Sequence, residues 1–487
     1  MEYMKHNITR ASALFITIFF FLPSSVFGAT RTLTLGLSGS DVTALQTALI
    51  TKGYLPAGKN TGYFGSLTQA AVKKFQCDNG IICANSGLAG YGNYGPRTRA
   101  ALMGGGSPES SSNTSSRGPF EISGWIPYWR TATGTADVLP HLSQLTSVMP
   151  FGYTMHEDGT LADTAHLTEE PWKSFIAEAK KNKVRVIPTV MWGDGDSIHR
   201  ILSNATTRVA LEDEIAKVVK ENNFDGIDID FEAKQHETID YFSTFLKGLY
   251  QRMGNKWVYC TVEARMPLDH RYSPGATIPP DAMDYANDYT EMNKYCDRVE
   301  IMAYDQGVID LTLNKARSAP YAPVADPAWV ESLVTLASQS IDKKKIIIGV
   351  ATYGYEYTVT PTAGGYKYDR LWAFNPRYAT DIAAKLGVLP TRNSAGEMGL
   401  IFDPKILTAI APTGNESTIT QQITPSSAVA QNLGSQVATN QPFNYLSWSD
   451  AQAIADKVAL ARRLGVKGIA VFKFDGGEDP GVWAALR

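Results

Sequence analysis

Near its middle the chain carries the stretch Phe224-Asp225-Gly226-Ile227-Asp228-Ile229-Asp230-Phe231-Glu232. Acidic and apolar residues alternate along it, which is typical of a β-strand, because successive side chains of a strand point to opposite faces. Asp228, Asp230 and Glu232 are therefore predicted on one face, and the apolar residues on the other, packed under helices. Asp225 has the opposite parity and is interpreted as a structural residue at the start of the strand.

Strand-like and helical patterns surround this stretch on both sides. The predicted strands are residues 121–126, 147–153, 184–191, 226–231, 257–264, 298–304, 345–353 and 468–474. The predicted helices are residues 171–182, 207–222, 238–253, 327–341 and 449–464. Strands that alternate with helices in this way predict an α/β fold, a (β/α)8 TIM barrel within residues 119–487. Residues 356–444, after the seventh strand, are too many for an ordinary loop and are predicted to be an insertion, structured around residues 368–389 and polar later.

The region before the barrel divides into three parts. Residues 104–118, GGGSPESSSNTSSRG, carry no apolar side chain and are predicted to be a flexible linker. Residues 31–103 show helical patterns that begin near Asp41 and Thr68, and residues 95–102 repeat the turn-plus-helix pattern of residues 65–72. This small module is predicted to be a three-helix bundle.

The first residues have the features of an export signal. Lys5 and Arg10 precede an apolar run over residues 11–22, and small residues follow it. Residues 1–28 are therefore predicted to be a signal peptide cleaved after Gly28, with a retained membrane anchor as the alternative. The mature protein is expected to be secreted or associated with the cell wall.

Composition narrows the partners and the compartment. A net charge of -3, from 45 basic and 48 acidic residues, provides no field that would gather nucleic acid or anionic membrane. In an oxidising compartment, Cys77 and Cys83 are predicted to form a disulfide, whereas Cys260 and Cys296 either pair or remain buried thiols. No histidine stands at a ligand spacing near a cysteine, so neither a metal site nor a cofactor is predicted. A monomer is expected.

The acidic face of the central strand indicates a chemistry. Three carboxyls inside a poorly hydrated barrel cannot all remain ionised, and Glu232, at the C-terminal end where barrel active sites open, is expected to hold a proton near neutral pH. A protonated carboxyl beside ionised ones is what glycoside cleavage requires. A calcium loop would have polar residues between the acids, and a magnesium site would draw its carboxylates from different strands. The pattern therefore favours a glycosidase.

These residues resemble a known family. Asp225 to Glu232 is similar to the signature Asp-Gly-x-Asp-x-Asp-x-Glu of the family 18 glycoside hydrolases, and Met302-Ala303-Tyr304-Asp305 and residues 349–355 resemble two further motifs of that family. Residues 125–129 and 150–153 resemble its spore-cortex and cell-wall lytic branch. The small module resembles the peptidoglycan-binding domain 1 family over residues 39–76, which implies attachment to the cell wall.

The resemblance implies a mechanism and roles for four residues. Such enzymes cut the bond after N-acetylglucosamine with retention, using the acetamido oxygen of the substrate as nucleophile. Glu232 would protonate the glycosidic oxygen, and Asp230 would accept the acetamido N–H. Asp228 would share a proton with Asp230. Tyr304 would donate its hydroxyl to the acetamido oxygen.

The resemblance also implies substrate contacts. The expected substrate-binding residues are Asp305, Met302, Trp125, Tyr128, Tyr153 and Phe472. Phe472 stands where the family often has a tryptophan, which leaves the substrate preference open. Peptidoglycan is favoured over chitin because of the small module, and a true chitinase is an alternative. Another is a weakly active or inactive carbohydrate-binding protein, although such relatives usually lack the terminal glutamate that is present here as Glu232.

Overall fold

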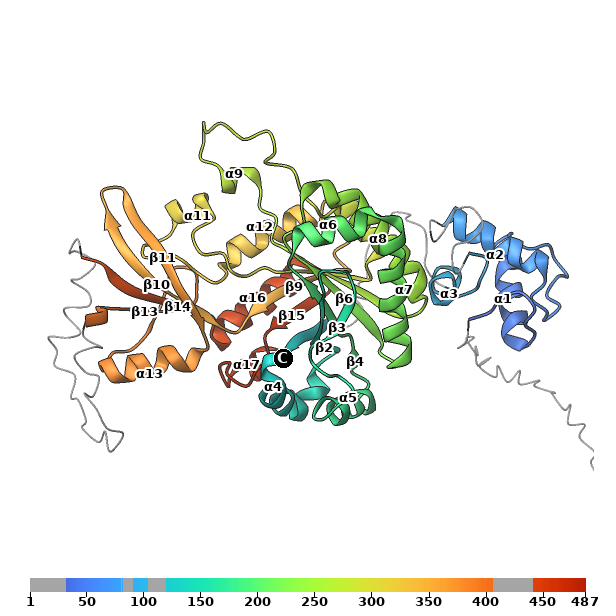
Figure 1. Cartoon of the computed structure of the whole chain (residues 1–487), viewed down its shortest axis with the longest axis horizontal. Helices are drawn as coiled ribbons and strands as arrows, with labels where there is room; N and C mark the ends of the chain where they lie inside the picture. The colour runs from blue at the N-terminus through green and yellow to red at the C-terminus, as the bar shows by residue number, and fades with distance from the viewer. Residues whose placement is uncertain (1–31, 80, 82–90, 104–119, 406–440) are drawn as a thin grey trace, which may run out of the picture. The chain divides into compact units, whose positions relative to one another are not determined.

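The computed structural model describes residues 32–79, 81, 91–103, 120–405 and 441–487. The chain divides into two compact units, Met1–Pro108 and Glu109–Arg487 (Figure 1). The expected signal peptide and the expected linker lie outside the described residues. Within the described ranges, no helix is both long and apolar enough to cross a membrane.

The first unit is a bundle of three helices, as predicted: α1 (Ser40–Thr51), α2 (Ser66–Asp78) and α3 (Pro96–Met103). Their facing sides enclose an apolar core that includes Val42, Leu45, Leu49, Phe64, Val72, Phe75, Tyr94 and Leu102. The apolar residues of α1 and α2 recur at three- and four-residue steps, so that each helix buries one face.

Two buried glutamines occupy equivalent places in this bundle. Gln46 donates to Thr68 in α2 at 2.9 Å, and Gln76 donates to Thr98 in α3 at 2.9 Å. Each glutamine also accepts a backbone N–H at 2.8 Å from the turn before its partner helix: Gln46 from Gly62, before α2, and Gln76 from Gly92, before α3. The repeated turn-plus-helix pattern in the sequence therefore corresponds to a repeated structural unit.

The second unit is built around a closed barrel of parallel strands, which confirms the predicted fold. Its strands are β1 (Glu121–Pro127), β2 (Ser147–Met155), β5 (Thr189–Trp192), β6 (Gly226–Phe231), β7 (Trp257–Val262), β8 (Arg298–Ile301), β9 (Ile346–Ala351) and β15 (Gly468–Phe472). The barrel closes because β1 pairs with both β2 and β15. A short strand, β3 (Leu161–Asp163), extends β2 in the antiparallel sense.

Helices connect these strands and surround the barrel (Figure 1). The five predicted ones are α5 (Trp172–Lys181), α7 (Ala205–Glu221), α8 (Ile239–Met253), α12 (Pro327–Ala337) and α16 (Ala451–Leu464). Shorter helices include α4 (Thr131–Val138), α6 (Gly195–Ser203) and α10 (Tyr289–Tyr295). Several begin at a side-chain cap: Asn204 accepts the Thr206 N–H at 2.9 Å, and Asp326 accepts the Ala328 N–H at 2.8 Å.

The third predicted strand is divided in the structure. Residues 184–191 form β4 (Arg185–Val186) and then β5, and Pro188 lies between them. Proline has no backbone N–H to donate to a neighbouring strand, so the ladder is interrupted at this residue. Both segments pair with β2, so together they take the place in the barrel that was predicted for one strand.

The N-terminal end of the barrel is filled by an ion-pair network. Glu121 accepts two hydrogen bonds from Arg298, at 2.7 and 2.6 Å, and lies 3.2 Å from Arg185 and 3.6 Å from Lys467. A layer of buried apolar side chains fills the interior: Trp125, Met149, Phe151, Ile187, Tyr259, Ile347 and Ala470. The interior is thus packed, and a site is expected at the carboxyl ends of the strands.

The predicted insertion forms a second sheet. It contains β10 (Gly354–Thr362), β11 (Gly365–Phe374), α13 (Pro376–Leu386), β12 (Thr391–Arg392), β13 (Met398–Phe402) and β14 (Phe443–Trp448). The antiparallel strands lie in the order β11-β10-β14-β13-β12, and α13 packs its apolar face with theirs (Figure 1). Most of the expected late polar tract, residues 406–440, lies outside the described residues.

One disulfide joins two neighbouring barrel strands. Cys260 of β7 bonds to Cys296, two residues before β8, and both residues are fully buried. The sequence left pairing and free thiols open, and the structure shows pairing. Closing a loop of 36 residues restricts the unfolded chain, which corresponds to about 3–4 kcal/mol of stabilisation. Cys83 lies outside the described residues, so its bond with Cys77 stays a prediction.

Candidate active site

The inward face of β6 carries the predicted carboxyls. Asp228 and Asp230 are 0% and 3% exposed inside the barrel, and Glu232 follows the C-terminal end of the strand. On the opposite face, Phe231 stacks on Phe245 of α8, with 5.4 Å between the ring centroids. Asp225, at the other end, accepts the Val186 N–H at 2.8 Å, which is a structural contact between strands.

Asp228 is fixed by three side-chain donors. Its carboxylate accepts hydrogen bonds from Trp125 at 3.1 Å, from Thr189 at 2.8 Å and from Thr261 at 2.8 Å. Burial raises the pKa of Asp228, and these three bonds oppose the rise because they favour the ionised form. The bonds engage both oxygens with groups other than Asp230, so the expected sharing of a proton between the two aspartates stays a prediction.

The pKa values of Asp230 and Glu232 are both raised. Burial, followed by the charges of Glu232 and Asp228, holds the pKa of Asp230 well above its usual range. Burial and then the charge of Glu263 raise the pKa of Glu232. Both carboxyls thus have a raised proton affinity, and the expectation from the sequence that Glu232 holds the proton stays a prediction.

One oxygen of Asp230 is buried and unsatisfied. Among the described residues, Oδ1 of Asp230 has no hydrogen-bond partner. Buried polar atoms are almost always hydrogen-bonded, so this oxygen is available to a donor that the protein itself does not supply. A ligand N–H or O–H could satisfy it.

Tyr304 and Asp305 lie beside this pair, just after β8. Burial and the charges of Asp230, Asp305 and Glu232 raise the pKa of Tyr304, which keeps its hydroxyl protonated as a donor. Gly349 makes room for the ring, because a Cβ there would lie 2.9 Å from a Tyr304 ring carbon. Asp305 has a left-handed backbone, φ 63°, and accepts hydrogen bonds from Tyr353 at 2.6 Å and Tyr355 at 2.9 Å.

Phe472 belongs to a cluster of aromatic rings at the ends of the strands. It stacks on Tyr304, with 5.6 Å between centroids, and meets Trp125 edge-on at 5.9 Å. Trp129, which is 49% exposed, is connected to Phe472 through Phe151. An exposed aromatic face next to a buried stack is suited to packing against sugar rings.

The other expected substrate contacts differ in how much surface they present. Trp125 is 1% exposed and donates to Asp228, so it supports the carboxylate from inside the barrel and has almost no surface for a ligand. Tyr153 is 4% exposed, whereas Tyr128 and Met302 are half-buried. Of the expected contacts, Tyr128, Met302, Asp305 and Phe472 therefore remain as candidates with accessible surface.

Three charged residues around the acidic strand were not predicted from the sequence. Glu300 of β8 is fully buried, and Ser123 and Thr261 donate to it at 3.4 and 3.5 Å. Burial and the charge of Asp228 hold its pKa well above the usual range. The alternation of Arg298-Val299-Glu300-Ile301 was a usable signal, because it turns Glu300 inward. Lys234 and Glu263, the other two, lie beside Glu232 and had no pattern that pointed to them.

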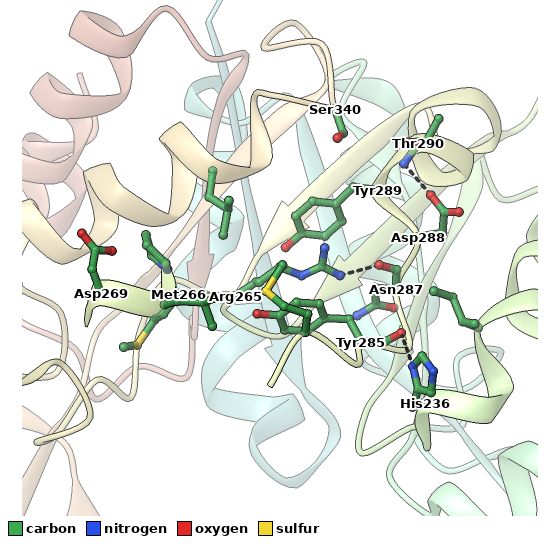
Figure 2. Close-up of a pocket in the computed structure, with 15 residues that line it drawn as sticks. His236, Arg265, Met266, Asp269, Tyr285, Asn287, Asp288, Tyr289, Thr290 and Ser340 are labelled. Atoms are coloured by element: carbon green, nitrogen blue, oxygen red, sulfur yellow. Dashed lines mark hydrogen bonds between the residues drawn. The ribbon is translucent and has the colours of Figure 1, made fainter. Parts of the chain in front are cut away.

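A pocket of about 680 Å3 lies next to this site, beside the segment that follows β7 (Figure 2). In it the Arg265 guanidinium lies between the rings of Tyr285 and Tyr289, 3.8 and 3.9 Å from their centroids. Arg265 donates to the backbone oxygen of Asn287, whose side chain donates to Glu263 at 3.0 Å. In the described part of the chain, no group of three or more His, Cys, Asp or Glu side chains is arranged to hold a metal ion.

Comparison with known families matches both units. Residues 122–477 match the model of the glycosyl hydrolases family 18, and residues 38–102 match the model of a putative peptidoglycan binding domain. The first match covers the barrel, the acidic strand and the insertion. The second covers the three-helix bundle.

Curated relatives match parts of the barrel. The chain is 28% identical over 166 residues to the uncharacterized glycosylase YvbX of Bacillus subtilis, which is 34% of this chain and 44% of that protein. It is 25% identical over 228 residues to the cortical fragment-lytic enzyme of the same organism, 45% of this chain and 48% of that protein. The chain thus spans less than half the length of these relatives.

Solved structures share the fold. The spore cortex-lytic enzyme SleL of Bacillus megaterium superimposes with a TM-score of 0.54 and 20% identity, covering 75% of this chain and 73% of that one. A chitinase from Chromobacterium violaceum superimposes with a TM-score of 0.55 and 17% identity, covering 76% of this chain and 98% of that one. At such identities the likeness concerns the fold alone.

Proposed function

Because the chain belongs to the glycosyl hydrolases of family 18, we propose that it is an exported glycosidase that cuts β-1,4 bonds in polymers containing N-acetylglucosamine. The observation that carries this proposal is the acidic face of β6, on which the pKa values of Glu232 and Asp230 are raised and Asp230 has a buried oxygen without a partner among the described residues. A proton donor next to an unsatisfied carboxylate suits a substrate that has both a glycosidic oxygen and an acetamido N–H.

In the first step Glu232 protonates the glycosidic oxygen, and the bond between that oxygen and the anomeric carbon breaks. The acetamido oxygen of the same sugar attacks the anomeric carbon and forms an oxazolinium ion. Asp230 accepts the acetamido N–H through Oδ1 and stabilises the positive charge on the new ring. Tyr304 donates to the acetamido oxygen and aligns it for the attack. Accepting the N–H favours the ionised form of Asp230, so the proton of the pair stays on Glu232.

In the second step the Glu232 carboxylate takes a proton from a water molecule, which attacks the anomeric carbon and opens the oxazolinium ring. Two displacements at one carbon retain its configuration. The stacked rings of Tyr304 and Phe472 lie beneath the sugar, and Asp305, held by Tyr353 and Tyr355, binds a sugar hydroxyl.

We favour peptidoglycan over chitin as the polymer. The first unit matches a putative peptidoglycan binding domain, and two relatives of the barrel are named as enzymes that lyse spore cortex or its fragments. A chitinase also shares the fold, so the barrel alone supports both polymers. The small unit is therefore the feature that favours the wall.

The proposal is tested by incubating residues 29–487 separately with purified peptidoglycan and with chitin. Soluble products are reduced with borohydride and identified by mass spectrometry. We expect fragments from peptidoglycan that end in reduced N-acetylglucosamine, because the acetamido group that attacks belongs to that sugar. Fragments that end in reduced N-acetylmuramic acid would contradict the proposed bond, and release from chitin alone would contradict the proposed polymer.

Wall attachment gives a separate prediction for the first unit. Deletion of residues 30–104 is expected to lower co-sedimentation with insoluble peptidoglycan at least about tenfold, because the remaining barrel has only its substrate contacts. Turnover of a short soluble substrate serves as the control and should not change, since the acidic strand lies in the other unit. Equal sedimentation of both proteins would contradict a tethering role.

A further inference from the structure

The turn that follows the acidic strand is held by a glutamate from the next strand. Ala233, directly after Glu232, has a left-handed backbone, φ 53°, which is uncommon for a residue other than glycine. Its N–H donates to Oε1 of Glu263 at 2.9 Å. Oε2 of Glu263 accepts a bond from Asn287 at 3.0 Å. Asn287 therefore holds the Glu263 side chain, and Glu263 in turn holds the backbone next to Glu232.

The second member of this arrangement is a buried lysine. The Lys234 side chain is 1% exposed, and its ammonium nitrogen lies 3.7 Å from Oε2 of Glu263 and 4.8 Å from the centroid of the Phe242 ring. The ammonium also donates to the backbone oxygen of Phe231. A buried ammonium is costly unless it is paired, and here its partner is Glu263.

The two side chains thus hold the residues on either side of Glu232. Lys234 binds the carbonyl of Phe231, before the acid, and Glu263 binds the N–H of Ala233, after it. From β5, the carbonyl of Trp192 accepts the N–H of Glu232 itself at 2.8 Å. Three hydrogen bonds from neighbouring segments therefore hold the backbone from Phe231 to Ala233, which carries the acid.

We propose that Lys234 and Glu263 are positioning residues for the reaction, and that their ion pair sets both the place of Glu232 and the pH range over which it can donate a proton. The inference rests on the proposed function, in which Glu232 is the acid. Neither residue needs to touch the substrate for this role. Their charges act on Glu232 in opposite directions, which makes the role measurable.

The charged groups that face Glu232 come from three elements. Asp230 belongs to its own strand, Lys234 follows that strand, Glu263 follows β7, and Asp305 follows β8. After burial, the charges of Glu263 and Asp305 raise the pKa of Glu232, whereas Lys234 lowers it. Glu232 donates only while it is protonated, so kcat/KM falls as the pH rises through its pKa. This fall is the alkaline limb of the pH profile. Loss of Lys234 should move that limb to higher pH, and loss of Glu263 to lower pH.

The test is the pH profile of kcat/KM for Lys234→Met, Glu263→Gln and the double variant, with a soluble fragment of whichever polymer the wild type hydrolyses. We expect the alkaline limb to move up by about one pH unit in Lys234→Met and down by about one unit in Glu263→Gln. The double variant, which removes both charges, should lie near the wild type. Lys217→Met and Glu221→Gln, which remove an exposed pair at 4.0 Å on α7, should leave the limb in place.

The outcomes separate this inference from the function on which it rests. If the wild type hydrolyses neither polymer, the proposed function fails. In an active enzyme, an unmoved limb or shifts in the same direction in both variants would overturn the inference. Should Lys234→Met fail to fold, as judged by near-UV circular dichroism, Glu263→Gln still decides the question, because Glu263 is 40% exposed and its replacement keeps the hydrogen-bonding shape.

Discussion

Replacing Glu232 by Gln is expected to lower kcat on the polymer about a thousandfold while binding of the polymer persists. The amide has the shape of the carboxyl, so the contacts of the half-buried side chain are kept, but it cannot transfer a proton to the glycosidic oxygen. Release of reducing ends measures the loss, and co-sedimentation with the polymer measures binding. Retention of more than a tenth of the wild-type kcat would contradict the role of Glu232 as acid.

The leaving group distinguishes loss of an acid from general damage. An aryl glycoside with a weakly basic leaving group needs little protonation, so Glu232→Gln should lose far less activity on it than on the polymer. A distorted site would lose activity on both. Glu237→Gln is the matched control, because Glu237 is an exposed glutamate on the same connection between β6 and α8, and its replacement should leave both activities unchanged.

Much of the barrel was predictable because its strands have clear ends. The acidic strand was placed at residues 226–231, the range that it has in the structure, since alternating acidic and apolar residues begin directly after Asp225 and Gly226. The division at Pro188 was missed because the apolar run continues through it. The sheet of the insertion was missed as well. Its strand β11 is exposed along most of its length, so its sequence lacks the alternation of buried apolar and exposed polar residues that indicates a strand.

The site was predictable only where one strand carries it. Alternation along β6 placed Asp228 and Asp230 in the interior, since that inference needs no contact with a distant residue. Lys234 and Glu263 were missed because their pairing depends on the adjacency of β6 and β7, which a local pattern does not contain. For Trp125 the sequence did not indicate the hydrogen bond that its indole donates to Asp228 from β1, and its contact with substrate stays a prediction.

Asp230→Asn is expected to lower kcat about a hundredfold, and for a different reason from the loss of the acid. The amide oxygen can still accept the acetamido N–H, but the negative charge that stabilises the oxazolinium ion is gone. The loss should therefore be similar on the polymer and on an aryl glycoside, because the acetamido group must attack in both cases. A loss confined to the polymer would contradict the proposed role of Asp230.

The pH profile of Asp230→Asn supplies an independent check. Burial is the largest cause of the raised pKa of both Asp230 and Glu232, and the charge of Glu232 raises the pKa of Asp230 further. Removing one charge leaves the other easier to ionise, so the pKa of Glu232 should fall and the alkaline limb of activity should move to lower pH. Asp305→Asn removes a charge that also raises the pKa of Glu232, and it should move the limb in the same direction without abolishing the attack. An alkaline limb that stays in place in Asp230→Asn would mean that the two carboxyls titrate independently. The charge of Asp230 would then not contribute to the raised pKa of Glu232.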